Sequence, residues 1–247
     1  MKLKELFKPS VKKLPHGELE PEDQVSSDAK VTEIGDGMYA NAAEHSDKIG
    51  EVVKTSNPIQ SIAGDGYLQF LSKILKNNRL QDNPYLPKIY SLNIYQKLIK
   101  GNKYYFYKIR MEKLRPLTSL SIKELQYIIN KAFHITSTLS TYTQDTLNNM
   151  LPKSRDKTKG KPEEYTKEQL LHIIVETLDN ALRQEVSTNN TVNIKDPKLK
   201  QAIYIIKSLI RNNKGFNDMH PGNIMYRLTS VGPQLVIIDP LSDADPI

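Results

Sequence analysis

The expected fold and site of this 247-residue chain depend mainly on one stretch, Asp218-Met219-His220-Pro221-Gly222-Asn223. A second segment supports it, the apolar run Leu235-Val236-Ile237-Ile238 that leads to Asp239. The Pro-Gly pair predicts a tight turn, which allows Asp218 and Asn223 to face one pocket. Ile224 and Met225 then enter a strand, and the later apolar run predicts a second, buried strand. Such a layout offers one carboxylate as a proton acceptor and two oxygen ligands for a hard cation such as magnesium.

These motifs resemble those of the early serine/threonine protein kinases of short-tailed bacteriophages. The resemblance rests on Asp-Met-His-x-Gly-Asn-Ile-Met at residues 218–225 and on Ile-x-Asp-Pro at residues 237–240. More distantly, the loop is similar to the Asp-x-His-Pro-Gly-Asn loops of aminoglycoside phosphotransferases and UbiB-like kinases. The resemblance extends from about residue 30 to the C-terminus, and it is weakest between Leu117 and Arg211.

The resemblance implies a role for each polar residue of this stretch. Asp218 would be the base that accepts the proton of an attacking hydroxyl, while Asn223 and Asp239 would hold the magnesium ions that bridge the phosphates of ATP. His220 is grouped with the catalytic residues, either beside the transferred phosphate or as a brace of the loop. ATP and Mg²⁺ are therefore the expected cofactors.

Segments upstream of this loop resemble the nucleotide-binding segments of kinases. Gly35-Asp36-Gly37 lies between two predicted strands, where kinases carry a glycine-rich loop over the phosphates, although Ala40 stands at the position of the third glycine. Lys54 ends the run Glu51-Val52-Val53 and resembles the lysine that holds the ATP phosphates. The residues that resemble the adenine-binding hinge follow the fifth predicted strand, at Met111, Glu112 and Leu114.

Two features depart from the kinase pattern. The helix that follows Lys54 lacks the usual glutamate partner, because the chain has no Asp or Glu between Asp65 and Asp82. Asp65, at the start of that helix, is one alternative partner for Lys54, and pairing with Asp239 and phosphate alone is another. The chain also stops at Ile247, eight residues after Asp239, so we expect no activation segment of the usual kind.

The expected fold class is α+β, with a compact, two-lobed, protein-kinase-like architecture. Residues 1–29 are expected to form an extended arm, residues 30–114 a small antiparallel-sheet lobe with one helix, and residues 115–247 a mainly helical lobe that contains the polar loop. Strands are predicted at 31–34, 38–44, 49–55, 88–98 and 103–111, with a helix at 66–78 between the third and fourth. Further helices are predicted at 121–138, at 166–184 and from 197 to a stop at Gly215, the first two from capping boxes.

Composition limits the classes of protein without choosing one. The sequence has no cysteine and no long apolar run, which excludes disulfide chemistry and favours a cytoplasmic protein without a membrane span, or one of the host cytoplasm if a phage encodes it. The net charge of +7 permits nucleic-acid binding but does not require it. The densest basic stretch, residues 153–161, is a solvated loop or a docking patch for an acidic partner.

The leading hypothesis from the sequence is a phage-type protein kinase that phosphorylates a host protein or itself. A second is a small-molecule phosphotransferase, and a third is a nucleotide-binding pseudokinase that acts as an interaction module. A nucleic-acid-binding protein ranks last. The pattern does not specify the target, the phosphate acceptor or the oligomeric state.

Overall fold

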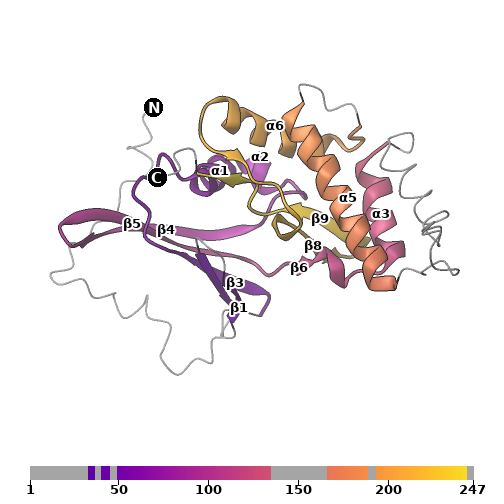
Figure 1. Cartoon of the computed structure of the whole chain (residues 1–247), viewed down its shortest axis with the longest axis horizontal. Helices are drawn as coiled ribbons and strands as arrows, with labels where there is room; N and C mark the ends of the chain where they lie inside the picture. The colour runs from indigo at the N-terminus through magenta and orange to yellow at the C-terminus, as the bar shows by residue number, and fades with distance from the viewer. Residues whose placement is uncertain (1–32, 37–39, 45–48, 135–165, 189–192, 244–247) are drawn as a thin grey trace, which may run out of the picture. The chain divides into compact units, whose positions relative to one another are not determined.

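The computed structural model describes residues 33–36, 40–44, 49–134, 166–188 and 193–243. It is an α+β structure with small antiparallel sheets and a few helices, so the coarse fold class predicted from the sequence is confirmed (Figure 1). The chain divides into two units, residues 1–63 with 88–113 and residues 64–87 with 114–247. The predicted arm at 1–29 and the basic loop at 153–161 lie outside the described residues.

The first unit is built on one antiparallel sheet with the strand order β1-β2-β3-β5-β4. The strands are β1 (Glu33–Asp36), β2 (Ala40–Glu44), β3 (Glu51–Ser56), β4 (Ile89–Ile99) and β5 (Asn102–Glu112). All five predicted strands are present, with bounds that differ by at most two residues within the described ranges. Between β4 and β5 the turn residues Lys100 and Gly101 have φ values of 48° and 83°, which suits a hairpin turn whose twist matches the strands.

The second unit contains the described helices and a set of short strands. The helices are α1 (Gly66–Leu75), α2 (Asn78–Gln81), α3 (Ile122–Ala132), α5 (Lys167–Ser187) and α6 (Pro197–Arg211). Two short 3-10 turns are η2 (Leu117–Ser119) and η3 (Pro221–Asn223). The strands are β6 (Arg115–Pro116), β7 (Phe216–Asn217), β8 (Ile224–Thr229), β9 (Gly232–Ile237) and β10 (Leu241–Ser242).

Helix starts follow the local sequence. Ser121 and Glu124 form a complete capping box at α3, and Thr166 and Gln169 form another at α5, as the sequence predicts. Asp196 caps α6, where Pro197 takes the first helical position. These side chains satisfy backbone N–H groups that the first helical turn leaves without partners.

The ends of α3 and α6 differ from the prediction, the first because of a contact distant in sequence and the second because of a local residue. Helix α3 ends at Ala132 rather than near residue 138, since Phe133 turns extended and bridges to Ile194. Helix α6 ends before Asn213, whose φ is 52°. The N–H of Asn213 bonds to the carbonyl of Ile210 and that of Lys214 to the carbonyl of Leu209, so an asparagine rather than Gly215 makes the left-handed stop.

The two remaining helices also have bounds other than those predicted. Helix α1 ends at Leu75 instead of residue 78, because Asn77 is extended and its side chain accepts a hydrogen bond from the N–H of Arg79 at the start of α2. Helix α5 continues three residues past the predicted end, to Ser187.

The segment that carries α1 and α2 belongs to the second unit, whereas the sequence analysis places it in the first lobe. Gly66, at the start of α1, lies so close to Ser242 that a Cβ atom there would overlap the Ser242 carbonyl oxygen. Tyr85, just after α2, donates a hydrogen bond of 2.9 Å to Asp196 at the start of α6. Contacts distant in sequence therefore tie this segment to the helices and to the chain that follows Asp239.

The core of the second unit lies between α3, α5, α6 and the β8–β9 hairpin (Figure 1). Its fully or almost fully buried side chains include Leu125, Ile128, Ile129, Ile174, Val175, Leu178, Leu182, Leu199, Ile203, Ile206, Leu235, Val236 and Ile237. Each such side chain contributes about 1.5–3 kcal/mol through removal of apolar surface from water. This packing gives the hairpin a firm support.

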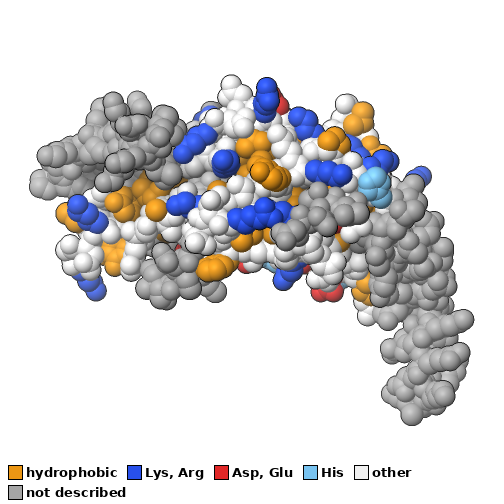
Figure 2. All heavy atoms as spheres, turned by 90° about the horizontal axis from the view of Figure 1, so that it is seen from above, with side chains coloured by type: hydrophobic (Ala, Val, Ile, Leu, Met, Phe, Trp, Pro, Cys, Tyr) orange, Lys and Arg blue, Asp and Glu red, His pale blue; other side chains and the backbone are white. Residues whose placement is uncertain are grey.

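Two features limit the possible partners of the protein, namely the character of its helices and the charge of its surface. Among the helices of the described ranges, none combines the length and the apolar character needed to cross a membrane. On the face drawn in Figure 2, blue Lys and Arg side chains are spread over the described residues with few red Asp and Glu side chains among them. The distribution agrees with the net charge of +7.

Candidate functional site

The candidate site is the Asp218–Asn223 loop, which connects β7 to β8. Its N-terminal end is held by β7, which pairs antiparallel with β10 through Asn217 and Leu241. Its C-terminal end enters β8, which pairs with β9 over six residues. Because β9 and β10 flank Asp239, both ends of the loop are attached to the segment that carries the second aspartate.

Backbone hydrogen bonds fix Asp239 beside the loop. The N–H of Asp218 donates to the carbonyl of Pro240 at 2.9 Å, and the N–H of Ile238 donates to the carbonyl of Asn223 at 2.9 Å. Asp239 lies between these two attachment points in the chain. The sequence-predicted residues Asp218, Asn223 and Asp239 are thus brought together by main-chain contacts that do not depend on their side chains.

Asn223 closes the loop from inside. Its side chain is buried, with 7% exposed, and its Nδ2 donates a hydrogen bond of 2.8 Å to the backbone carbonyl of Asp218. That bond commits the amide nitrogen and leaves Oδ1 as the remaining side-chain ligand. Among the described residues, no donor is recorded for Oδ1. An amide oxygen held this way suits a hard cation.

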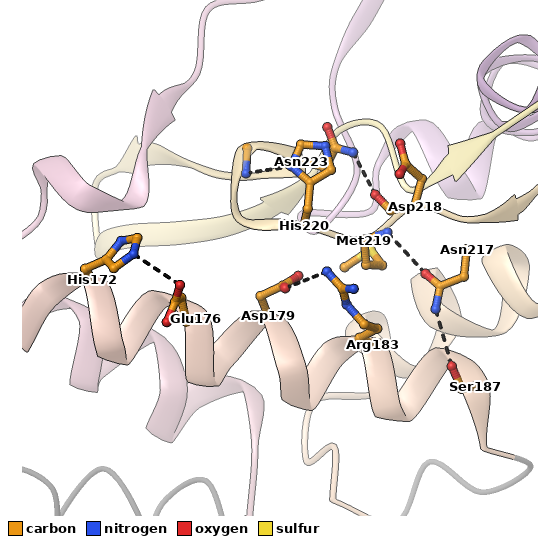
Figure 3. Close-up of polar contacts among 11 residues, drawn as sticks. His172, Glu176, Asp179, Arg183, Ser187, Asn217, Asp218, Met219, His220 and Asn223 are labelled. Carbon is orange, nitrogen blue, oxygen red and sulfur yellow. Dashed lines mark hydrogen bonds and ion pairs between the residues drawn. The ribbon is translucent and has the colours of Figure 1, made fainter.

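Asp218 presents its carboxylate outward while its neighbours anchor the loop. The side chain is exposed, and within the described residues its carboxylate makes no hydrogen bond or ion pair. Met219 is 2% exposed and is drawn between the loop and α5 in Figure 3. The N–H of Met219 also donates to Oδ1 of Asn217 at 3.2 Å. The carboxylate of Asp218 is therefore accessible on a loop that is itself held in place.

His220 braces the turn. Its Nδ1 accepts a hydrogen bond of 3.1 Å from the N–H of Gly222, which places the proton of a neutral ring on Nε2. A Cβ atom on Gly222 would lie 2.9 Å from Cε1 of His220, so a larger residue there would require the ring to shift. The Pro-Gly turn expected from the sequence is the 3-10 turn η3.

A carboxylate on α5 lies beneath the loop. Asp179 is 3% exposed, and one of its oxygens accepts a hydrogen bond of 3.0 Å from Arg183 (Figure 3). In the described part of the chain its other oxygen, Oδ1, has no hydrogen-bond partner. Burial raises the pKa of Asp179, while the cation of Arg183 and, more weakly, His220 act in the opposite direction. Asp179 could not be predicted as part of the site, since an acidic residue in a helix gives no signal of burial.

Tyr67 is a second residue that the sequence analysis missed. It lies in the first turn of α1 and is 6% exposed. Burial raises the pKa of Tyr67 well above its usual range, and the carboxylates of Asp239 and Asp65 add to the effect. A neutral phenol therefore lies near Asp239. Asp65 itself caps α1, where one carboxylate oxygen accepts a hydrogen bond of 2.7 Å from the N–H of Leu68.

The residues predicted to bind the nucleotide phosphates lie in the first unit. Gly35 pairs with Ala42 across β1 and β2, and Ala42 pairs with Lys54 across β2 and β3. Gly35 and Lys54 thus stand in one row, two strand spacings or about 10 Å apart. Asp36 is the last residue of β1, and Gly37 lies outside the described residues. Lys54 has polar or electrostatic contacts of its own.

The predicted hinge lies where the chain passes between the units. Met111 and Glu112 are buried at the end of β5, and Leu114 is the first residue assigned to the second unit after it. Glu112 is tied to Lys88 twice, through its own N–H to the Lys88 carbonyl at 3.1 Å and through Oε1 to the Lys88 N–H at 2.8 Å. This pairing fixes the end of β5.

Asn223 and Asp239 are the side chains expected to hold magnesium. Within the described residues, no three His, Asp or Glu side chains gather into a ready-made metal cluster. Asn223 and Asp239 supply an amide oxygen and a carboxylate, and magnesium in phosphate-binding sites commonly takes only one or two protein ligands, with phosphates and water completing its shell. The residues therefore fit a metal that arrives with a phosphate ligand.

No family model matches the chain, and no curated protein matches it either. The chemistry of the site consequently rests on the geometry of the described residues. That geometry is an accessible carboxylate, a buried amide whose nitrogen is committed, and a second carboxylate held next to both.

Proposed function

We propose that the protein is an ATP- and magnesium-dependent phosphotransferase with a two-lobed, kinase-like fold, of the serine/threonine protein kinase type of short-tailed bacteriophages. One observation carries the proposal, namely the attachment of the residues on both sides of Asp239 to the two ends of the Asp218–Asn223 loop. An ordinary polar turn has no need to hold an aspartate from another strand in this way.

The proposed reaction is transfer of the γ-phosphoryl group of ATP to a hydroxyl. The oxygen of the acceptor forms a bond to phosphorus, the bond from phosphorus to the ADP oxygen breaks, and the hydroxyl proton passes to the carboxylate of Asp218. Exposure of that carboxylate supports this role. Asn223 and Asp239 would hold magnesium, which neutralises charge that develops on the phosphates.

The first unit would supply the nucleotide-binding groups. Lys54 would contact phosphate oxygens, and the backbone around Gly35, Asp36 and Gly37 would cover them. Met111, Glu112 and Leu114 would face the adenine. The proposed acceptor is a protein of the host cytoplasm or the chain itself. The loop at Asp218–Asn223 is also similar to that of aminoglycoside phosphotransferases, but the sequence shows no acidic segment of the kind that would bind an aminoglycoside.

A second candidate function is a nucleotide-binding pseudokinase that acts as an interaction module. One observation favours it: α1 contains no acidic residue, and Asp65 at its start uses a carboxylate oxygen to cap the helix. A kinase ordinarily needs the ion pair between its phosphate-binding lysine and a helix glutamate for activity. Without that pair, ATP binding could persist while phosphate transfer is lost.

Phosphate transfer by the purified full-length chain tests the proposal. Incubation with γ-labelled ATP, magnesium and a mixed bacterial protein extract should label a protein in the extract or the chain itself. Asp218→Asn should lower the rate by about 10²–10⁴-fold, the usual contribution of a general base. Asp82→Asn is the matched control, because Asp82 is exposed just after α2 and should leave the rate unchanged.

The same experiment, together with calorimetric titration of the chain with Mg-ATP, separates the two candidate functions. Binding of Mg-ATP without any labelled product would support the pseudokinase and overturn the enzyme. Equal labelling by the wild type and Asp218→Asn would show that this carboxylate has no part in the reaction. Absence of both binding and labelling would contradict both candidates.

A further inference from the structure

The β4–β5 hairpin carries most of the net positive charge of the chain. Residues 88–113, which include both strands, contain seven Lys or Arg residues and one acidic residue, Glu112, so their net charge is +6 against +7 for the whole chain. Glu112 is buried, and its Oε1 accepts a hydrogen bond from the N–H of Lys88. Charge of one sign concentrated on one element attracts a partner of the opposite sign.

The two faces of this hairpin differ in burial. On β5 the side chains of Tyr107, Ile109 and Met111 are buried, whereas the side chains that alternate with them are half-buried. Because successive side chains of a strand point to opposite faces, one face of the hairpin is covered and the other is more accessible. Lys54 pairs with Ile109 and therefore shares the covered face. The accessible face is thus opposite to the lysine that is proposed to bind ATP.

Aromatic and basic side chains lie side by side on the accessible face. Tyr95 is directly opposite Phe106 in the strand pairing, and Lys97 is directly opposite Tyr104. The rings of Tyr95 and Phe106 are stacked, with their centroids 5.5 Å apart and their planes at 8°. The Nζ atom of Lys97 lies 5.9 Å from the centroid of the first ring and 5.6 Å from that of the second. Among the described residues, Lys97 forms no ion pair with an acidic side chain.

This combination fits the chemistry of a single-stranded nucleic acid. Lysine side chains neutralise phosphates, and aromatic rings on the surface of a sheet stack with unpaired bases. An acidic peptide would use the lysines but would offer no flat group to the rings, and the bases of a duplex are not free to reach them. Each strand has 11 residues and spans about 37 Å, which is long enough for several nucleotides. Net charge alone does not select such a partner, whereas charge and rings on one face favour it.

From these features we infer that the accessible face of the β4–β5 hairpin binds single-stranded nucleic acid, RNA or DNA, without sequence specificity. Lys97 and the other lysines of the hairpin contact phosphates, and the ring of Phe106 stacks with a base. The inference does not depend on the proposed function, because this face is opposite to Lys54 and includes none of the proposed catalytic or metal-binding residues.

Fluorescence anisotropy of the full-length chain tests this surface with two labelled probes, an oligouridylate and an oligothymidylate of about 12 nucleotides. We expect a Kd of about 1–100 μM at physiological salt, and the probe that binds more tightly shows whether RNA or DNA is preferred. Phe106→Leu keeps an apolar side chain but removes the ring, and it should weaken binding by about tenfold. Lys97→Gln should weaken binding and reduce the slope of log K against log salt concentration by about 0.7. Tyr204→Leu and Lys198→Gln, both at exposed positions of α6, are the matched controls.

Thermal unfolding without nucleic acid checks that each variant is folded, and Lys97→Gln keeps the test decisive if loss of the Phe106 ring disturbs the sheet. Failure of the wild type to bind either oligonucleotide would overturn the inference. Unchanged binding by both hairpin variants, or equal weakening by the controls, would show that any bound nucleic acid lies elsewhere. A third probe is a peptide with the sequence of residues 18–28, which has five acidic residues and no basic one. Tighter binding of this peptide than of both oligonucleotides would overturn the inference in favour of an acidic protein segment.

Discussion

Two antiparallel hairpins of the protein, β4–β5 and β8–β9, are held in different ways. The strands of β4–β5 have 11 residues each, and the turn is set by Lys100 and Gly101, both with positive φ. The strands of β8–β9 have six residues each, and the hydroxyl of Thr229 makes two hydrogen bonds within their turn. This second turn also receives a hydrogen bond from Tyr127 of α3 at Val231, so a helix contact adds to its local bonds.

The difference matters because the second hairpin leads to Asp239. Contacts on β9 and just after it include the N–H of Ile237 to the carbonyl of Tyr85 and the N–H of Ile238 to the carbonyl of Asn223. Lys131 of α3 also donates to the side chain of Gln234 at 2.8 Å. A strand held on several sides keeps the groups at its end in place.

The largest expected effect compares one residue from each hairpin, a buried one in β9 and an exposed one in β4. Ile237→Ala in β9 should lower the free energy of unfolding by about 2–5 kcal/mol, because it leaves a cavity in a fully buried site. Leu98→Ala in β4, where 68% of the side chain is exposed, should change it by no more than about 0.5 kcal/mol. Urea unfolding of both variants measures the contrast, and similar losses would remove the distinction between the hairpins.

A smaller effect is expected from the turn of the second hairpin. Tyr127→Phe removes the O–H that donates to the carbonyl of Val231 at 3.1 Å and should cost about 1 kcal/mol. Because the rest of the ring remains, packing should be little changed. Urea unfolding gives the size of the loss, and hydrogen exchange at β8 and β9 should show faster opening. An unaltered exchange pattern would mean that the turn is set locally after all.

The first hairpin should instead respond to its own turn residues. Lys100→Asn places a residue that tolerates the left-handed region at a φ of 48° and should stabilise the protein by about 0.5 kcal/mol. Thermal unfolding of this variant beside Lys103→Asn, a strand residue outside the turn, measures the gain. A loss of stability for Lys100→Asn would contradict the local origin of this turn.

The smallest expected effect is a change of stability with pH, caused by the buried Asp179 of α5 beneath the loop. Because the pKa of Asp179 is raised above its usual 3.8, the folded state favours the protonated carboxyl. Its contribution to stability is therefore greatest below about pH 4 and is lost as pH rises through the raised pKa. Relative to Asp179→Asn, the wild type should lose stability between pH 4 and pH 7. Chemical unfolding over that range gives the difference, and a difference that is constant or of opposite sign would rule out this explanation.

Local signals made much of the fold predictable from the sequence. The capping residues Ser121 and Thr166, the hairpin turn at Lys100-Gly101 and the alternation of the first five strands all act within a few residues of themselves. The tight turn between Asp218 and Asn223 is predictable for the same reason, since its Pro-Gly pair acts locally. The structure then showed how the chain around Asp239 is attached to it.

The features that the sequence did not reveal depend on partners far along the chain. Phe133 ends α3 because it meets Ile194, and Tyr67 lies near Asp239, more than a hundred residues later. No pattern around either residue encodes such a meeting. Asn213 is different, because asparagine is known to tolerate the left-handed stop, so the end of α6 could have been found by weighing it against Gly215.

The central claim is that Asp239 and Asn223 hold a magnesium–nucleotide complex beside Asp218, and calorimetric titration tests it most directly. The full-length wild type, Asp239→Asn and the control Asp82→Asn are titrated with ATP, once with magnesium and once with EDTA. We predict that the wild type and the control bind Mg-ATP equally and that Asp239→Asn weakens Mg-ATP binding by about tenfold or more, or about 1.4 kcal/mol, while metal-free ATP binds all three alike. Absence of Mg-ATP binding by the wild type, or equal Mg-ATP affinity in Asp239→Asn, would contradict the claim.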